Sequence, residues 1–499
     1  MSNTSSTYDV AIVGAGPSGL VLARLLSLRG RSVALIDPNR IVCQHPRATH
    51  LDDETMRTLQ TLGAGDLEPR FLRQTGWKLT AEGAAFLEFY IPGEDTDQGW
   101  YSDYMFHQPD FESRLRGLLA NDASVGLHLG VETIGLREVG DGVEVATRDL
   151  VAGENGVIRA SYVVGCDGAN SFVRRAMGAE VEDLHGTQRS LIIDVHPFEH
   201  PATLPEKEGF ALCDGERPLT FVPIFPPKLR FEFMLRPEDV AADLVRPSSV
   251  YELLRPWMEP GTYRILRTDV YEWHAYLVRG WRKDRVLVAG DAAHEMPPML
   301  GQGMCSGLRD SVNLAWKLDA VLGGADESLL DTHESERAPH VRPYIEESAR
   351  QSNMIESFID PALRPEPGSE AQLLVRHRPL LGPGLAEEPG GAVGQLSPQA
   401  VGPDGLKLDD LVGYQFLVVG DAAVMAAVDD SVREAWARLG WVVIDSPPDA
   451  LAAWLTEHDA RAAIIRPDRY TYAVAADAAS LSAASLELAT RLSPVPASA

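Results

Sequence analysis

Two turns in this chain of 499 residues have the residue types and the spacing to bind a nucleotide. The first is the run GAGPSG at residues 14–19, and Asp37 follows it after about 20 residues. Gly14 permits a tight turn, Gly16 lets the backbone approach a pyrophosphate, and Gly19 allows a helix to pack closely on a strand. An acid at the position of Asp37 accepts hydrogen bonds from ribose hydroxyls. The pattern predicts one firmly bound dinucleotide, and no second copy of it follows a strand.

The second turn, Gly290-Asp291, ends a short apolar run at residues 286–289. The loop at 297–303 then contains two prolines and two glycines, so regular structure is expected to resume only at Ser306, where helical spacing of apolar residues begins. An acid at a strand end suits a polyol hydroxyl. The helix N-terminus offers unpaired N–H groups and a partial positive charge to an electron-rich oxygen.

The elements that position both turns are expected from the apolar periodicity. Strands at 8–13 and 33–36 flank a helix at 20–28, which places the first turn between strand and helix. A further strand at 162–165 ends at Asp167-Gly168, and Arg174, one turn into the next helix, can face a phosphate. Two more helices are expected, at 52–62 and 111–119.

The second turn and its loop resemble the second FAD motif of single-component flavoprotein aromatic hydroxylases, through GDAAH at 290–294, the two prolines at 297–298 and GQG at 301–303. In that family the aspartate matched by Asp291 binds the ribityl chain, and the arginine matched by Arg47 reaches the pyrophosphate. A family glutamine near the flavin matches Gln108, and the motif matched by Asp167 serves both FAD and the nicotinamide donor. The resemblance therefore implies that FAD is bound tightly, without a covalent bond, by Gly14, Gly16, Pro17, Ser18, Gly19, Asp37, Arg47, Gln108, Asp167, Gly290, Asp291, Pro298, Gly301, Gly303 and Met304.

The resemblance also implies a reaction. NAD(P)H reduces FAD, O₂ adds at the flavin C4a, and the resulting hydroperoxide transfers one oxygen to a phenolic ring, ortho to its hydroxyl, to give a catechol. The protein must keep water out and help the phenol to lose its proton. The residues predicted to serve catalysis are Pro297, in the loop that borders the flavin ring, and four candidates to accept the proton, His50, Tyr101, Tyr271 and His274.

The resemblance indicates the substrate less specifically than it indicates the cofactor and the reaction. The segments at 107–109, 271–275 and 466–470 resemble 3-(3-hydroxyphenyl)propionate hydroxylases most closely, which implies a phenol with a short acidic side chain. An uncharged phenol, resorcinol, nitrocatechol or polyketide remains open, and so does a flavoprotein that does not hydroxylate. A substrate carboxylate needs a cationic partner; the arginines considered for this are Arg189, Arg230 and Arg264, although exposed strand positions are more typical for them.

The predicted fold class is α/β with three parts. A Rossmann-like FAD-binding domain comprises 1–75 with 105–185 and 277–360, and an antiparallel sheet inserted into it, 76–104 with 186–276, forms the roof of the substrate pocket in the family. The sheet rests on alternating strands at 191–193, 219–225, 229–235 and 264–276.

The third part follows a linker rich in proline and glycine at 361–403. Residues 404–499 have the order βαβαββα of a thioredoxin-like domain, with strands at 415–419, 441–444, 462–465 and 470–474 and helices at 430–439, 448–458 and 476–492. No cysteine follows Cys305, so this domain lacks the CxxC pair of thioredoxin chemistry. It is expected to be structural or to serve dimerisation, which makes a homodimer a candidate assembly.

Composition excludes several partners. A formal net charge of −27 argues against nucleic acid and against anionic membranes, because both require clustered Lys and Arg. No apolar run approaches the roughly 18 residues of a membrane span. Four cysteines, scattered without a CxxC pair, fit a reducing cytoplasm and no disulfide framework. The expected partners are a small phenol and O₂, and no metal is expected.

Overall fold

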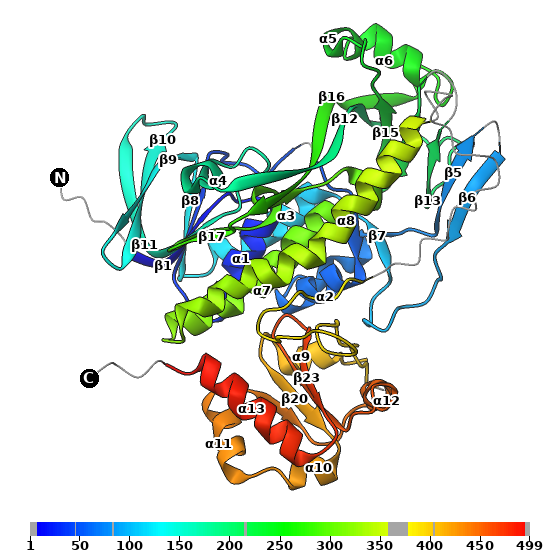
Figure 1. Ribbon diagram of the computed structural model, residues 1–499. Coiled ribbons are helices and arrows are strands. Elements are labelled where there is room, and N and C mark those ends of the chain that lie inside the picture. Colours follow the sequence, from blue (N-terminus) through cyan, green and yellow to red (C-terminus); the bar gives the residue numbers. More distant parts are fainter. Residues whose placement is uncertain are drawn as a thin grey trace.

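The computed structural model describes residues 7–44, 46–81, 84–213, 217–357, 378–402 and 405–494. These residues form a mixed α/β structure with several sheets (Figure 1). Within the described ranges no helix is both long enough and apolar enough to cross a membrane. The cysteines at 43, 166, 213 and 305 form no disulfide bond with one another.

The first sheet carries the two glycine turns. Its main path runs β17-β18-β11-β1-β2-β8, and the hairpin β9–β10 pairs with β11 through β10. The strands are β1 (Thr7–Val13), β2 (Val33–Asp37), β8 (Val125–Leu129), β9 (Val131–Val139), β10 (Gly142–Asp149), β11 (Asn155–Gly165), β17 (Arg282–Lys283) and β18 (Val286–Val288). Strands β1, β2, β8, β11 and β18 are parallel. Their carboxyl ends therefore meet at one edge, which is where ligands bind in open α/β sheets.

Both faces of this sheet are buried, as expected for parallel strands. Val10 and Ile12 of β1 pack into one apolar cluster with α1 and α7, whereas Ala11 and Val13 pack into a second cluster on the other face. The helices around the sheet are α1 (Pro17–Leu28), α2 (Asp53–Thr61), α3 (Gln108–Ala120), α4 (Phe172–Met177), α7 (Gln302–Leu322) and α8 (Thr332–Ser357). Short 3-10 helices, η1 (Gly65–Arg70), η2 (Gly290–Ala292), η3 (Pro298–Leu300) and η4 (Glu327–Asp331), connect them.

The expected start of α7 at Ser306 is wrong. The helix begins at Gln302, directly after Gly301, which takes a left-handed conformation with φ +64° as the N-cap. Gly303 lies inside the first helical turn. Glycine lowers helix propensity by only about 1 kcal/mol, and the 21 residues of α7, most of them buried, outweigh that cost. The glycine pair was therefore misinterpreted as a longer irregular loop.

The second sheet has the order β19-β16-β12-β15-β14-β13-β5-β6 and is antiparallel except between β5 and β13. Its strands are β5 (Gly76–Ala81), β6 (Ala84–Tyr90), β12 (Glu180–Pro197), β13 (Glu208–Leu212), β14 (Leu219–Pro223), β15 (Leu229–Met234), β16 (Tyr263–Arg279) and β19 (His294–Glu295). One face packs into an apolar cluster with α5 (Ala241–Leu244) and α6 (Pro247–Leu254). A separate small sheet joins β3 (His50–Asp52), β4 (Leu72–Arg73) and β7 (Asp103–Met105).

The C-terminal unit, orange to red in Figure 1, has a four-stranded sheet in the order β21-β20-β22-β23. Its elements are β20 (Leu417–Gly420), β21 (Val442–Ile444), β22 (Ala462–Ile465), β23 (Thr471–Ala475), α9 (Leu408–Val412), α10 (Ala422–Ala426), α11 (Asp430–Arg438), α12 (Asp449–Glu457) and α13 (Ala478–Leu492). The βαβαββα order expected from the sequence is present, with the short helices α9 and α10 in addition. Of the linker expected at 361–403, residues 361–377 and 403 lie outside the described residues.

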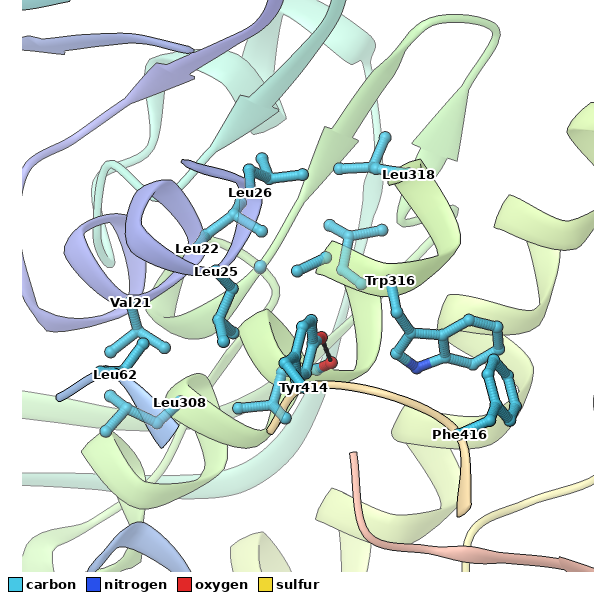
Figure 2. Close-up of a cluster of buried hydrophobic side chains, with 14 of the residues drawn as sticks. Val21, Leu22, Leu25, Leu26, Leu62, Leu308, Trp316, Leu318, Tyr414 and Phe416 are labelled. Carbon is cyan, nitrogen blue, oxygen red and sulfur yellow. Dashed lines mark hydrogen bonds between the residues drawn. The ribbon is translucent and has the colours of Figure 1, made fainter. Parts of the chain in front are cut away.

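The C-terminal unit shares an apolar core with the first sheet's helices. Figure 2 shows leucines of α1 packed with Trp316 of α7 and with Tyr414 and Phe416, which precede β20. The rings of Trp316 and Phe416 have centroids 5.4 Å apart, and the Tyr414 hydroxyl donates to the carbonyl of Val312. The two parts are therefore built around one continuous core.

Candidate functional site

At positions 14 and 19, neighbouring backbone atoms of the protein leave room only for glycine. Gly14 has φ +106°, and a Cβ there would lie 2.3 Å from the carbonyl oxygen of Cys166 at the end of β11. A Cβ on Gly19 would lie 1.9 Å from the carbonyl oxygen of Gly14. Both glycines thus let β1, α1 and β11 approach one another closely.

Gly16 is different, because a Cβ at this position would meet nothing within 4 Å. It is the N-cap of α1, with an ordinary φ of −78° and no side-chain capping hydrogen bond. The approach to the N-terminus of α1 is therefore open on this side. A helix N-terminus with this approach fits the pyrophosphate of FAD.

Asp37 is buried at the end of β2 and shapes the same turn. Its Oδ2 accepts from the N–H of Ala15 at 2.7 Å, and its Oδ1 accepts from the N–H of Asn39 at 2.7 Å. A carboxylate has about four acceptor sites. Asp37 can therefore hold the turn and still accept from ribose hydroxyls.

The turn after β11 is tied to the turn after β18. Asp167 caps α4, accepting from the N–H of Val173 at 3.0 Å and from the hydroxyl of Ser171. Arg174 donates to the carbonyl of Ala292 at 3.2 Å and to the hydroxyl of Tyr276 at 2.8 Å. Both predicted side chains thus have partners within the chain. Arg174 positions the turn after β18, whereas Asp167 positions the start of α4.

Gly290 and Asp291 lie where the sequence predicts, at the carboxyl end of β18. Gly290 has φ +65°, and a Cβ would come within 2.7 Å of the Ser18 hydroxyl, so this turn packs directly on α1. The half-buried carboxyl of Asp291 has no hydrogen bond to any described residue. Desolvation raises its pKa, and the nearby guanidinium of Arg47 opposes that shift. An acid of this kind fits the hydroxyls of a polyol chain.

The loop that contains Arg47 also lies near Asp291. The Oε1 atom of Gln108 accepts from the N–H groups of Arg47 and Ala48 at 2.9 and 3.1 Å, and its Nε2 donates to Glu112 at 2.7 Å. Gln108 therefore positions this loop rather than projecting freely. The guanidinium of Arg47 lies 5.4 Å from the ring centroid of Tyr271, a predicted catalytic residue on β16.

His50 packs against the proline–glycine loop. Pro297 is buried and Pro298 is exposed at the start of η3. A Cβ on Gly301 would lie 2.8 Å from the His50 side chain, whose Nδ1 is 3.2 Å from the Gly301 carbonyl. The His50 Nε2 is 3.2 Å from Asp103 on β7. Gly303 and Met304 follow in the first turn of α7.

The other candidate bases are placed differently. Burial raises the pKa of Tyr101 to about 12, and its hydroxyl donates to the carbonyl of Gln74. His274 is exposed, with its Nδ1 3.2 Å from the hydroxyl of Thr187. The structure therefore brings Tyr271 to Arg47 and Asp291 and places His50 against the loop at Gly301, whereas neither the Tyr101 nor the His274 side chain reaches them.

One acidic residue of the site was not predicted. Glu295 on β19 pairs in register with Tyr276. Burial, followed by the charge of Asp291, raises the pKa of Glu295 to about 7. Its only signal in the sequence is its position four residues after Asp291, which does not distinguish it from a surface acid.

None of the three arginines considered as carboxylate partners is free in the site. Arg230 is fully buried, with Asp194 bound bidentately at 2.7 and 3.0 Å and the carbonyls of 46 and 47 on its remaining N–H groups. Arg189 donates to the carbonyls of Arg236 and Pro237. Arg264 is exposed, as expected for a strand residue.

Comparison with protein families gives two matches. Residues 7–348 match the family described as FAD binding domain, and residues 394–491 match the HcaD C-terminal domain. The chain is 36% identical to a probable NADH-specific resorcinol 4-hydroxylase of Rhodococcus jostii, over 98% of this chain and 96% of that protein. It is 30% identical to a 3-(3-hydroxy-phenyl)propionate/3-hydroxycinnamic acid hydroxylase of Klebsiella pneumoniae, over 94% of this chain and 92% of that protein.

Solved structures show the same fold. The flavin-dependent monooxygenase PieE, in complex with FAD and substrate, superposes with a TM-score of 0.80 at 20% identity, over 98% of this chain and 99% of that one. Aklavinone-11 hydroxylase, in complex with FAD and aklavinone, has a TM-score of 0.77 at 22% identity, over the same shares. The family matches, the full-length relatives and the turns at the sheet edge agree, and the chain belongs to the family of single-component FAD-dependent aromatic hydroxylases.

Proposed function

We propose that this FAD-dependent monooxygenase hydroxylates a phenol with a single aromatic ring, ortho to its hydroxyl, with NADH as the electron donor. The observation that carries the proposal is the carboxyl of Asp291. It has no hydrogen bond within the described chain, and it lies at the sheet edge that also bears the open Gly16 turn and the loop of Arg47. The relative from Rhodococcus, whose name specifies NADH and resorcinol, supports the choice of donor and of a phenol.

The chain's own residues bind and orient the reactants. The first turn of α1 would hold the pyrophosphate of FAD, Asp37 and Asp291 would accept from its ribose and ribityl hydroxyls, and the N-terminus of α7 would offer its N–H groups to an electron-rich oxygen. When bound, FAD supplies the electron transfer and the activation of O₂. The buried loop residue Pro297 helps to keep water from the ring.

His50 is assigned to hold the loop rather than to accept the phenol proton. Its Nδ1 lies 3.2 Å from the Gly301 carbonyl and its Nε2 lies 3.2 Å from Asp103, and both of these partners are hydrogen-bond acceptors. An imidazole whose two nitrogens both face acceptors has no free lone pair to take a proton from the phenol.

The domain boundaries deduced from the sequence are part of the proposal, and so is a thioredoxin-like class for the C-terminal unit. The parallel pairing of β20 with β21, followed by antiparallel β22 and β23, supports that class. A homodimer and a location in the cytoplasm stay predictions.

The test is the oxidation of NADH and NADPH by the FAD-loaded enzyme with and without a panel of phenols, with each product identified by mass. Phenols that accelerate NADH oxidation and gain one oxygen support the proposal. Oxidation that no phenol accelerates, without a hydroxylated product, supports the alternative of a flavoprotein that does not hydroxylate.

A further inference from the structure

One face of helix α7 packs against both glycine turns. At Gly307 a Cβ would lie 2.5 Å from the hydroxyl oxygen of Ser18 and 3.0 Å from the Cα of Gly290. One helical turn further on, the hydroxyl of Ser311 donates to the carbonyl of Ser18 at 2.9 Å. Residues three and four positions apart lie on the same face of a helix. This face of α7 therefore contacts the first turn of α1 and the turn after β18 together.

Asp310 lies on the same face and is fully buried. Its Oδ2 accepts from the N–H of Gly290 at 3.0 Å and from Nε2 of His294 at 2.7 Å. Its Oδ1 accepts from Nε of Arg337 on α8 at 2.9 Å. Burial raises the pKa of Asp310, but His294 and Arg337 lower it by more, so the pKa lies below its usual range. The carboxylate is therefore ionised and serves three donors at once.

The rest of the turn's backbone is held by other elements. The hydroxyl of Tyr276 on β16 donates to the carbonyl of Asp291 at 2.8 Å. Arg174 of α4 donates to the carbonyl of the next residue at 3.2 Å. Asp310 adds the acceptor for the N–H that opens the turn. The backbone is thus fixed from three elements, whereas the Asp291 carboxyl has no hydrogen bond to any described residue.

We infer that Asp310 is a positioning residue for FAD. It holds the turn from which Asp291 would accept from the ribityl hydroxyls, and it keeps that turn at a fixed distance from the first turn of α1. It does not touch the cofactor itself. The inference rests on the assignment of Asp291 to FAD and not on the identity of the phenol or of the electron donor.

The first test is Asp310→Asn, which keeps the shape of the side chain and replaces one oxygen with an NH₂ group. However the amide turns, a donor then faces either Arg337 or the N–H of Gly290, both of which are donors. The dissociation constant for FAD is obtained from the flavin fluorescence released when the FAD-loaded enzyme is diluted. FAD should bind at least about 10-fold more weakly, with a shifted flavin absorption spectrum.

The matched control is Glu336→Gln, which also removes a buried acid. Glu336 lies on α8 and binds Lys317 and Arg466, away from the glycine turns. This variant should lower the melting temperature as Asp310→Asn does, but it should leave the FAD dissociation constant and the flavin spectrum unchanged. Equal effects of the two variants on FAD would overturn the inference, because loss of stability alone would then explain both.

A double variant tests whether Asp310 acts through Asp291. In the Asp291→Ala background, Asp310→Asn should weaken FAD by less than about 3-fold more, because residues that act as a unit are not additive. The full factor seen in the wild-type background would overturn the inference. Unchanged FAD affinity in Asp291→Ala alone would also overturn it, together with the assigned role of Asp291.

Gly307→Ala tests the same contact without removing a polar group, in case Asp310→Asn does not fold. The added Cβ must push α7 away from Ser18 and Gly290, and FAD should bind at least about 5-fold more weakly, the lower end of the cost of overpacking. Its control is Gly117→Ala within α3, where a Cβ meets nothing within 4 Å and FAD affinity should not change. Unchanged FAD affinity in Gly307→Ala would overturn the inference.

None of these measurements needs a phenol or an electron donor. An enzyme that hydroxylates no phenol but shows these changes in FAD binding would refute the proposed function and support the role of Asp310. Hydroxylation by an enzyme whose FAD affinity does not depend on Asp310 or Gly307 would support the proposed function and overturn this inference.

Discussion

Gly16 and Gly19 lie one helical turn apart, yet the structure restricts them for different reasons. The protein's own backbone requires glycine at position 19, because a side chain there would collide with the carbonyl of Gly14. Gly16 has an ordinary backbone conformation and open space around it. Among the described residues nothing would meet a side chain at position 16, so a ligand is what we expect a side chain there to obstruct, and this difference can be measured.

Gly16→Ala should leave the apoprotein as stable as wild type, because the added Cβ meets no atom within 4 Å. It should weaken FAD by at least 10-fold, since the methyl group occupies the space through which the pyrophosphate approaches the backbone. Thermal unfolding of the apoprotein and FAD titration by fluorescence quenching measure the two effects. Gly19→Ala is the comparison, and it should impair folding itself. FAD affinity unchanged by Gly16→Ala would contradict the assigned position of the pyrophosphate.

Glu295 should make stability depend on pH. Its pKa is raised from the usual 4.5 to about 7 by burial, so between these values the folded chain holds a proton that the unfolded chain releases. The stability that this group contributes is therefore present below about pH 4.5 and is lost as the pH rises through about 7. Glu295→Gln cannot ionise. Its melting temperature relative to wild type should rise between about pH 5 and pH 8, whereas the exposed Glu346→Gln should show no such trend. Parallel pH curves for wild type and Glu295→Gln would show that burial does not raise this pKa.

At the scale of elements, the flavin loop depends on close packing between Gly301 and His50. Gly301 adopts φ +64° to start α7, and its position against the imidazole leaves no room for a Cβ. The loop, the N-terminus of α7 and the His50 side chain are therefore packed together and are expected to move together. A change that separates them should affect coupling of NADH oxidation to hydroxylation before it affects the fold.

Gly301→Ala should increase the share of NADH that yields hydrogen peroxide instead of hydroxylated phenol, because the Cβ must displace His50 or the loop. Gly63→Ala is the matched control. Gly63 also has a positive φ, +75°, but a Cβ there meets nothing within 4 Å. Both variants place an alanine at a positive φ, which costs about 1 kcal/mol. They therefore differ only in whether the added Cβ collides with a neighbouring side chain. Equal peroxide yields for the two variants would refute the role of this contact.

The elements with a strong periodicity of apolar residues were predicted from the sequence. Elements that break a local rule, such as the exclusion of proline from helix interiors, were missed. The glycine turns, the acids at strand ends and the strands of the C-terminal unit follow from spacing alone. Helix α8 was not anticipated, since it contains Pro339 and Pro343 within 26 residues. Its tertiary packing outweighs the local cost, with Val341, Ile345 and Ala349 buried in the core beside the first sheet. The hairpin β9–β10 was also missed.

Contacts between side chains on neighbouring strands could not be predicted from the sequence. Asp103 meets His50 only because β7 lies beside β3, and Asp194 meets Arg230 only because β12 lies beside β15. Strand order depends on contacts between distant residues, and one sequence does not encode it in a local pattern. His274 shows that a residue predicted for the site can also fail to reach it. Its neighbour Tyr271 reaches the site, but the His274 side chain is exposed.

At the scale of the whole molecule, buried charges join the C-terminal unit to α7 and α8. Arg466, between β22 and β23, binds both carboxyl oxygens of Glu336 on α8 at 2.8 and 2.9 Å. Lys317 of α7 binds the same carboxyl at 2.7 Å, and burial lowers its pKa to about 8. Trp316 donates to Asp468 at 3.2 Å. With the shared apolar core, this network makes the C-terminal unit a structural part of the flavin domain.

Arg466→Met should therefore destabilise the entire enzyme by about 3–5 kcal/mol, the cost of breaking a buried ion pair. Chemical denaturation followed by circular dichroism and by release of flavin fluorescence should give coincident transitions, both shifted. Arg461→Met, which removes an exposed ion pair with Asp421, should cost no more than about 1 kcal/mol. Loss of the C-terminal unit's structure at a denaturant concentration that leaves flavin bound would contradict a shared core.

The most direct measurement of the central claim is the fate of molecular oxygen in a single reaction. The FAD-loaded enzyme is supplied with NADH and resorcinol under ¹⁸O₂, and the product is analysed by mass spectrometry. We expect a product with one labelled oxygen atom, formed in proportion to the NADH consumed. Consumption of NADH with all of the label in hydrogen peroxide, or a product whose new oxygen comes from water, would contradict it.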